Sequence, residues 1–257
     1  MYRIILLLLG FLLHYQLLGK SIDSAMVMDK VVLANQIQEE YPDSAYQLAQ
    51  EVYRYSIEKN YPEGIAYASM RLGHINNVRG KNDLALFFMN RAYHIRLSNQ
   101  DLKGAIGASY TLSYIYKELG KTDSSFSILF KALDLSKDIP DSLSIGEVCL
   151  ELGYSFKENG DYNNAIKYLN EAEKINSKIK DTKLEIRIKN TIASVYHKQN
   201  KNEEALKLHL EVNNILKEYS FSDALLINLN NIATCYSDLN QTSKAKEIYI
   251  FFLQTIK

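Results

Sequence analysis

A short pattern of small and apolar residues recurs along the chain about every 40 residues, and it constrains the fold more than any other feature. In its clearest copy, Gly146–Ala172, a Leu152-Gly153 pair precedes a turn at Gly160 and then Ala165. The same offsets fit two copies before this one and two after it, and a more degenerate copy precedes them all. Repetition without insertions predicts an elongated array of about six units, each burying its apolar face on the next.

The small residues indicate where two helices meet in each unit. Two helices that cross closely leave no room for large side chains at the contact. On the expected first helices this position is held by Gly73, Ser113, Gly153, Ala193 and Ala233. On the expected second helices it is held by Ala45, Ala85, Ser125, Ala165, Ala205 and Ala245.

Glycine and asparagine mark the turn between the two helices. These residues adopt a positive φ most easily, and a positive φ commonly ends a helix. They recur at one offset as Gly80, Gly120, Gly160, Asn200 and Asn240. Each unit is therefore expected to read helix, tight turn, helix.

From about Met26 onward the pattern resembles the tetratricopeptide repeat family. The family's order of Leu-Gly, Tyr and then Ala-Phe/Leu-Ala is matched best in Ala66–Ala92 and Gly146–Ala172. The period exceeds the family's roughly 34 residues, which implies longer helices or linkers, and the early Trp and late Pro are absent. HEAT and armadillo arrays share the longer period, but they are not expected to repeat these small residues. The resemblance implies an all-α, right-handed superhelical solenoid of helix–turn–helix repeats.

The chain divides into a leader and six units. The units are a degenerate first repeat at 26–65, repeats at 66–105, 106–145, 146–185 and 186–225, and an incomplete sixth repeat at 226–257. Residues 1–21 carry Arg3 followed by the apolar run Ile4–Leu13, which is typical of a secretory signal peptide. Cleavage is expected near Gly19 or Ser21, and an uncleaved membrane anchor is the alternative. Export to the periplasm, with possible membrane attachment, is the resulting expectation.

Composition and motifs argue against nucleic-acid binding and catalysis. The chain has 30 Lys and Arg against 30 Asp and Glu, so it has no basic excess to attract nucleic acid. It contains no glycine-rich phosphate loop, nucleophile elbow or metal-binding His/Cys motif. Cys149 and Cys235 are expected to be separate core residues, and His209 falls at a core position of a second helix. No enzymatic activity, cofactor or metal is predicted.

The resemblance places the exposed positions of the first helices on a concave groove. These positions are Tyr67, Met70, His74, Asn77, Tyr110, Tyr114, Lys117, Leu150, Tyr154, Lys157, Arg187, Asn190, His197 and Asn230. Tyrosine, amide and basic side chains suit an extended peptide. The alternative for each tyrosine is packing with its hydroxyl in water. The Lys and Asn pair of repeats that clamp a C-terminal carboxylate is absent, because Met70 and His74 stand at the corresponding places.

The last helix carries apolar residues on more than one face, which predicts self-association, a docking partner or a further element of a longer protein. Exported arrays of this type resemble the sensory N-terminal regions of bacterial histidine kinases and helix-turn-helix regulators. We therefore expect a protein-binding or peptide-binding scaffold, either free-standing or the signal-transduction sensor of a truncated receptor. A cytoplasmic, peptide-responsive regulator is the alternative.

Overall fold

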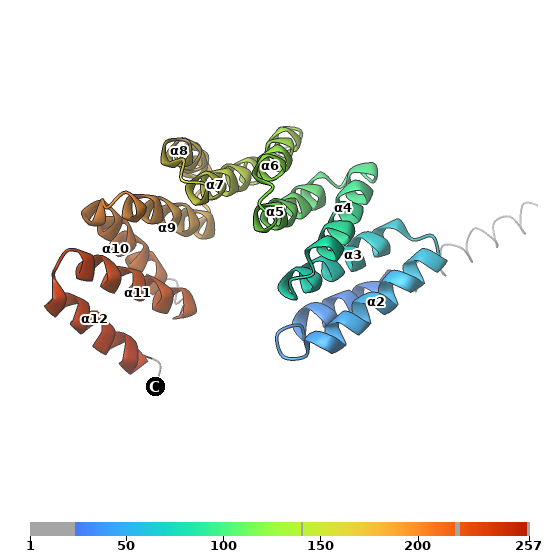
Figure 1. Cartoon of the computed structure of the whole chain (residues 1–257), viewed down its shortest axis with the longest axis horizontal. Coiled ribbons are helices and arrows are strands. Elements are labelled where there is room, and N and C mark those ends of the chain that lie inside the picture. Colours follow the sequence, from blue (N-terminus) through green and yellow to red (C-terminus); the bar gives the residue numbers. More distant parts are fainter. Residues whose placement is uncertain (1–23, 140, 219–221, 256–257) are drawn as a thin grey trace, which may run out of the picture. The chain divides into compact units, whose positions relative to one another are not determined.

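The structure is a computed structural model that describes residues 24–139, 141–218 and 222–255, and these residues are helical apart from short turns. A first helix covers residues 24–36. The helices that follow are α2 (Pro42–Glu58), α3 (Pro62–Val78), α4 (Asn82–Ser98), α5 (Leu102–Glu118), α6 (Thr122–Lys137), α7 (Ser142–Glu158), α8 (Tyr162–Ile179), α9 (Thr182–Lys198), α10 (Asn202–Glu218), α11 (Ser222–Asp238) and α12 (Thr242–Thr255) (Figure 1). The predicted signal peptide at 1–21 lies outside the described residues. Among the described helices, none has the length and apolarity needed to cross a bilayer.

Long helices and short turns account for the long period. Helices such as α3, α5, α7 and α9 each have 17 residues, and turns as short as 59–61 join them. The predicted turn residues do have positive φ: 69° at Gly80, 70° at Gly120, 79° at Gly160, 60° at Asn200 and 58° at Asn240.

The turns that lead from one repeat to the next have the same backbone form. Asn60, Gln100 and Lys180 have φ of 49°, 59° and 60°. Among the described residues from Asn60 to Asn240, left-handed residues therefore recur about every 20 residues, twice as often as the glycine and asparagine pattern indicated. The sequence left longer helices or longer linkers as explanations of the 40-residue period, and the structure shows that longer helices are the correct explanation.

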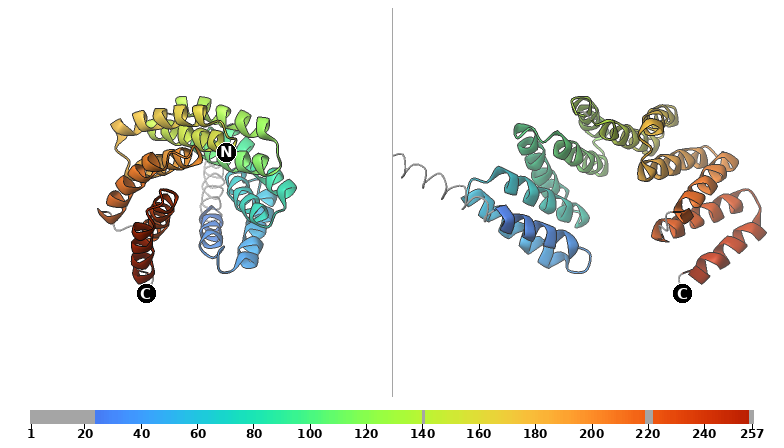
Figure 2. Two further views of the ribbon diagram at one scale, coloured as in Figure 1. Left: turned by 60° about the vertical axis from the view of Figure 1, so that its left-hand side comes forward. Right: turned by 180° about the vertical axis from the view of Figure 1, so that it is seen from behind.

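The chain forms two compact units, Met1–Ile128 and Leu129–Lys257, and the division falls inside α6. In the N-terminal unit α3 packs against α2, α4 and α5. In the C-terminal unit α9 packs against α7, α8 and α10, and α11 lies between α10 and α12 (Figure 2). Within each unit, first helices of successive repeats thus touch each other as well as their own second helices.

The predicted close crossings are present. A Cβ on Gly153 would lie 2.6 Å from Leu169 Cγ, and one on Gly73 would lie 2.7 Å from Met89 Cγ. In the next crossing Ser113 and Ser125 are small enough to approach each other, and their hydroxyl oxygens lie 2.7 Å apart. The small residues therefore set how near the two helices of a repeat can come.

The C-terminal unit is held by a core that runs from α7 to α9. Leu169, Ala172, Leu184, Ile188 and Val195 are at most 2% exposed and belong to one cluster. Cys149 and Cys235 are buried and form no disulfide, as predicted. Burial raises the pKa of each thiol to about 11.

On the last helix Tyr249 and Ile250 are 42% and 46% exposed. This is consistent with apolar residues facing outward, but the side chains after Ile250 lie outside the described residues. Self-association through this helix stays a prediction.

Replacing Gly153 by Ala should lower the free energy of unfolding by about 1–3 kcal/mol, because the new methyl group would press on Leu169 and on the Ala165 carbonyl at 3.2 Å. Chemical denaturation would measure this loss. Gly107→Ala is the control, because a Cβ there has no neighbour within 4 Å. It should raise stability by about 0.5–1 kcal/mol through helix propensity. Equal effects at both glycines would contradict the crossing geometry.

Candidate functional site

The predicted groove residues lie on the first helices α3, α5, α7, α9 and α11, and all but one keep some exposure. They are Tyr67, Met70, His74 and Asn77 on α3; Tyr110, Tyr114 and Lys117 on α5; Tyr154 and Lys157 on α7; Arg187, Asn190 and His197 on α9; and Asn230 on α11. Leu150 is the exception and needs correction. It is 2% exposed and belongs to the core of the C-terminal unit, because its place on α7 faces the neighbouring helices.

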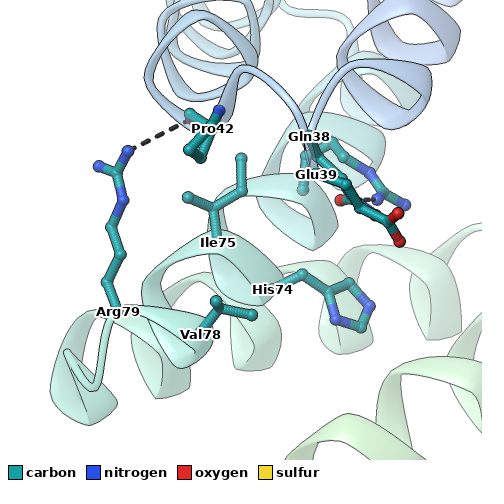
Figure 3. Close-up of a pocket in the computed structure, with 8 residues that line it drawn as sticks. Gln38, Glu39, Pro42, His74, Ile75, Val78 and Arg79 are labelled. Carbon is teal, nitrogen blue, oxygen red and sulfur yellow. Dashed lines mark hydrogen bonds between the residues drawn. The ribbon is translucent and has the colours of Figure 1, made fainter.

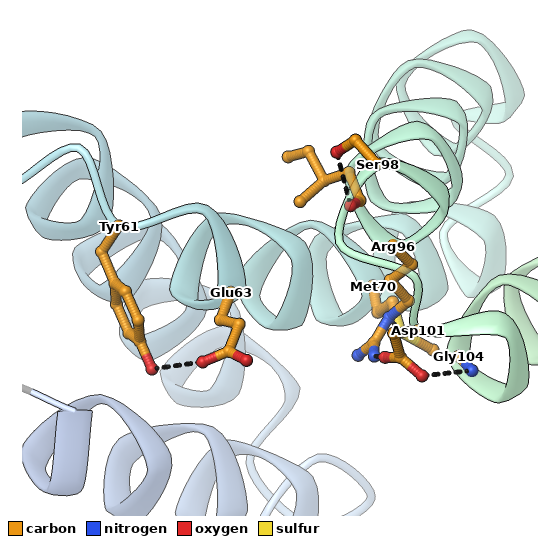
Figure 4. A network of polar contacts seen from close by, with 8 residues as sticks. Tyr61, Glu63, Met70, Arg96, Ser98, Asp101 and Gly104 are labelled. Atoms are coloured by element: carbon orange, nitrogen blue, oxygen red, sulfur yellow. Dashed lines mark hydrogen bonds and ion pairs between the residues drawn. The ribbon is translucent and has the colours of Figure 1, made fainter.

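In the N-terminal unit Tyr67 and Met70 pack against a buried arginine. Arg96 is 8% exposed and forms an ion pair with Asp101 (Figure 4). Its Cζ lies 4.7 Å from the centroid of the Tyr67 ring, and its Nε lies 3.2 Å from Met70 Sδ. Asp101 also accepts a 2.9 Å hydrogen bond from the Gly104 amide, which caps α5. Tyr67 and Met70 therefore help to join α3 to α4.

A pocket of about 530 Å³ opens farther along α3 (Figure 3). Its lining is Gln38, Glu39, Pro42, Arg71, His74, Ile75, Val78 and Arg79. Sequence analysis indicated only His74 among these residues. It missed Arg71, which lies between the predicted groove positions Met70 and His74, and Val78, which follows the predicted position Asn77.

In the C-terminal unit polar contacts connect successive first helices. Arg187 Nη2 on α9 donates to Glu151 Oε1 on α7 at 2.6 Å. Burial raises the pKa of Glu151, and Arg187 opposes this shift. Farther along the same two helices, Lys157 Nζ lies 3.4 Å from Ser194 Oγ and 4.4 Å from the centroid of the Tyr154 ring. These contacts bring the predicted groove residues Tyr154, Lys157 and Arg187 onto one surface with Glu151 and Ser194.

The next pair of first helices is joined by His197. Its Nε2 lies 2.7 Å from Asp238 Oδ2, so α9 is tied to α11. Beside this contact is a cavity of about 130 Å³. The cavity is lined by Asn190, Ser194, His197, His209, Asn231, Thr234 and Cys235.

Side-chain amides orient the imidazole of His209 at this cavity. His209 is 5% exposed, as predicted for a core residue. Its Nδ1 lies 3.2 Å from Oδ1 of Asn190 and 3.2 Å from Oδ1 of Asn228. Asn228 Nδ2 donates to the His209 carbonyl at 2.8 Å, which turns the Asn228 oxygen toward the ring. Because both neighbours of Nδ1 are oxygens, Nδ1 carries the proton and Nε2 is left as an acceptor.

Burial lowers the pKa of His209 to about 4, and the hydrogen bond with Asn228 only partly offsets this effect. The unfolded chain therefore binds more protons than the folded chain between pH 6.5 and about pH 4. This group therefore lowers the free energy of unfolding as the pH falls from 6.5 to about 4, and it causes no such loss above pH 6.5.

Among the described residues, no group of three or more His, Cys, Asp and Glu side chains could hold a metal ion.

His209→Gln should remove this pH dependence. Between pH 6.5 and pH 4 the wild-type chain should lose about 2 kcal/mol more unfolding free energy than the variant, because only the wild-type chain has this buried imidazole to protonate. Urea denaturation at a series of pH values measures the difference, and contributions from all other groups cancel in the comparison. Parallel pH profiles for the two proteins would show that the buried imidazole is not the titrating group.

Comparisons with known proteins agree with the repeat fold. The tetratricopeptide repeat model matches residues 106–139 and 146–179. No curated protein sequence matches the chain significantly.

Solved structures share the fold at low sequence identity. BtubC from P. vanneervenii is 14% identical with a TM-score of 0.67, over 89% of this chain and 90% of BtubC. The apo form of RapI is 12% identical with a TM-score of 0.66, over 90% of this chain and 97% of RapI. NprR in complex with its cognate peptide NprX is 14% identical with a TM-score of 0.61, over 91% of this chain and 67% of NprR. The chain is a solenoid like those of tetratricopeptide repeat proteins.

Proposed function

We propose that the protein is a non-enzymatic scaffold that binds an extended peptide or protein segment on its first helices. The observation that carries this proposal is the surface of α7, α9 and α11 in the C-terminal unit. There Tyr154 is 39% exposed, and amide, hydroxyl and imidazole groups surround a cavity of about 130 Å³. Aromatic area and side-chain amides are the groups that commonly recognise a peptide chain.

The charges on this surface favour hydrogen bonding over charge-driven capture. Arg187 is paired with Glu151, and Lys157 with Glu158. The surface therefore offers little net charge, and a ligand would be held by aromatic contact and by hydrogen bonds to groups such as Asn190 and Asn230. The solved complex of NprR with its peptide NprX supports this class of ligand for a fold of this kind.

Location and signalling role belong to the same proposal. The signal-like sequence at 1–21 supports an exported scaffold, and the analogy with exported sensory regions supports a role in signal transduction within a longer receptor. The alternative is a cytoplasmic peptide-responsive regulator, and the fold likeness to NprR in complex with its peptide supports only the peptide-binding part of it.

The N-terminus of the protein from its native cell separates these two locations. Export predicts a mature chain that begins near residue 20, recovered outside the cytoplasm, because the apolar run Ile4–Leu13 would direct secretion before cleavage. Mass spectrometry of the terminal peptide makes the measurement. An intact Met1 in the cytosolic fraction would favour the regulator.

Peptides selected from a phage-displayed library of random linear peptides should depend on the first helices. The double substitution Tyr154→Ala and Asn230→Ala should weaken the selected peptides at least roughly tenfold, because it removes aromatic contact and an exposed amide. Fluorescence anisotropy with labelled peptides measures the affinity.

The second helices provide a matched control. Tyr249 on α12 is 42% exposed, close to the 39% of Tyr154, and Asn214 on α10 is also exposed. Tyr249→Ala with Asn214→Ala should leave affinity unchanged. If this pair weakens binding and the first-helix pair does not, the ligand binds elsewhere and the proposed site is wrong.

A further inference from the structure

The second repeat departs from the others at the mouth of the α3 pocket. Residues at one offset near the end of the first helix are charged in every later repeat, as Glu118, Glu158, Lys198 and Asp238. In the second repeat this residue is Val78, and its side chain is 87% exposed. The repeat fold therefore does not need an apolar group here, since four other repeats do without one.

The same repeat also has an unusual arginine. At the offset of Arg71 the later repeats carry Thr111, Glu151, Thr191 and Asn231. Arg71 Nη1 donates to Asn35 Oδ1 at 2.5 Å and to Gln38 Oε1 at 3.1 Å, and both acceptors belong to neutral amides. Arg71 Nε is buried and has no hydrogen-bond partner among the described residues.

Arg71 is the pocket cation that lacks a carboxylate. No ion pair joins Arg71 to any described residue, whereas the other arginine of the pocket, Arg79, pairs with Asp43 at 2.5 Å and stacks on the Tyr46 ring. Burial lowers the pKa of Arg71, because the guanidinium is partly removed from water. Burial and the Arg71 charge also lower the pKa of His74, so this ring stays neutral near pH 7 and can add one hydrogen bond.

We propose that this pocket binds a carboxylate flanked by an apolar side chain, supplied by an acidic residue of a peptide ligand. The carboxylate would pair with the Arg71 guanidinium, and the neighbouring apolar side chain would lie against Pro42, Ile75 and Val78. The pocket of about 530 Å³ has room for both groups. This inference rests on the proposed peptide-binding function and adds an anchor in the N-terminal unit.

Glu39 gives the proposal a further consequence. It is exposed and lines the same pocket, so its negative charge opposes an anionic ligand at the rim. Removing this charge should strengthen binding, which a purely apolar ligand would not show.

The test uses the blocked dipeptide N-acetyl-Leu-Glu-amide as the probe, with NMR detection of the Val78 methyl groups and Arg71 Nε–H in the full chain. Saturable shifts at both groups are expected, and N-acetyl-Leu-Gln-amide should bind at least roughly tenfold more weakly because it lacks the charge. N-acetyl-leucine places a C-terminal carboxylate beside an apolar side chain, so it tests whether the pocket prefers a chain end to an acidic side chain. Tighter binding of this free C-terminal carboxylate than of the Glu probe would overturn the assignment to an acidic side chain.

Val78 and Glu39 are exposed, so substitutions at these two positions should leave the fold intact. Val78→Glu copies the residue at this offset in the third and fourth repeats and should abolish binding, whereas Val78→Leu should preserve it. Glu39→Gln should strengthen binding roughly twofold to fivefold. Equal binding of the Glu and Gln probes, or wild-type binding by Val78→Glu, would overturn the proposal. If the dipeptide fails while library peptides still depend on Tyr154 and Asn230, this inference is wrong and the proposed function stands.

Discussion

The close crossing of two helices at a small residue is the interaction on which the rest of the structure depends. Gly153 lies directly against Leu169, and Gly73 against Met89, so a larger residue would force each pair apart. Left-handed residues such as Gly160 and Lys180, which follow helices α7 and α8, then reverse the chain after a fixed length. Because both devices recur along the chain, one local solution builds each unit from contacts between helices that are near each other in the sequence.

This regularity separates residues that maintain the fold from residues available for function. The crossings use the buried sides of the helices, and the first helices of successive repeats then meet within each unit. Their remaining sides carry residues that differ from repeat to repeat. Val78 and Arg71 depart from the other repeats in the N-terminal unit, and the amides around His209 distinguish the C-terminal unit. Function is proposed where the repeats differ.

Sequence reasoning predicted the helix–turn–helix order, the small-residue crossings and the buried state of His209 and the two cysteines, because each depends on local spacing. It missed the left-handed turns at Gln100 and Lys180, since neither residue type indicates positive φ. It placed Leu150 on a groove, although small differences in helix rotation bury that side chain. It also missed Arg71, because only the packed structure shows that its acceptors are neutral amides.

The central claim is that ligands bind on the first helices, and hydrogen–deuterium exchange tests it most directly. Exchange would be compared for the full chain with and without a peptide selected from the random library. Binding should slow exchange in the segments of α7, α9 and α11 whose side chains contact the peptide. Exchange in the second helices α8 and α10 should not change, because a bound peptide would cover only the first-helix surface. Protection confined to α8 and α10 would contradict the claim.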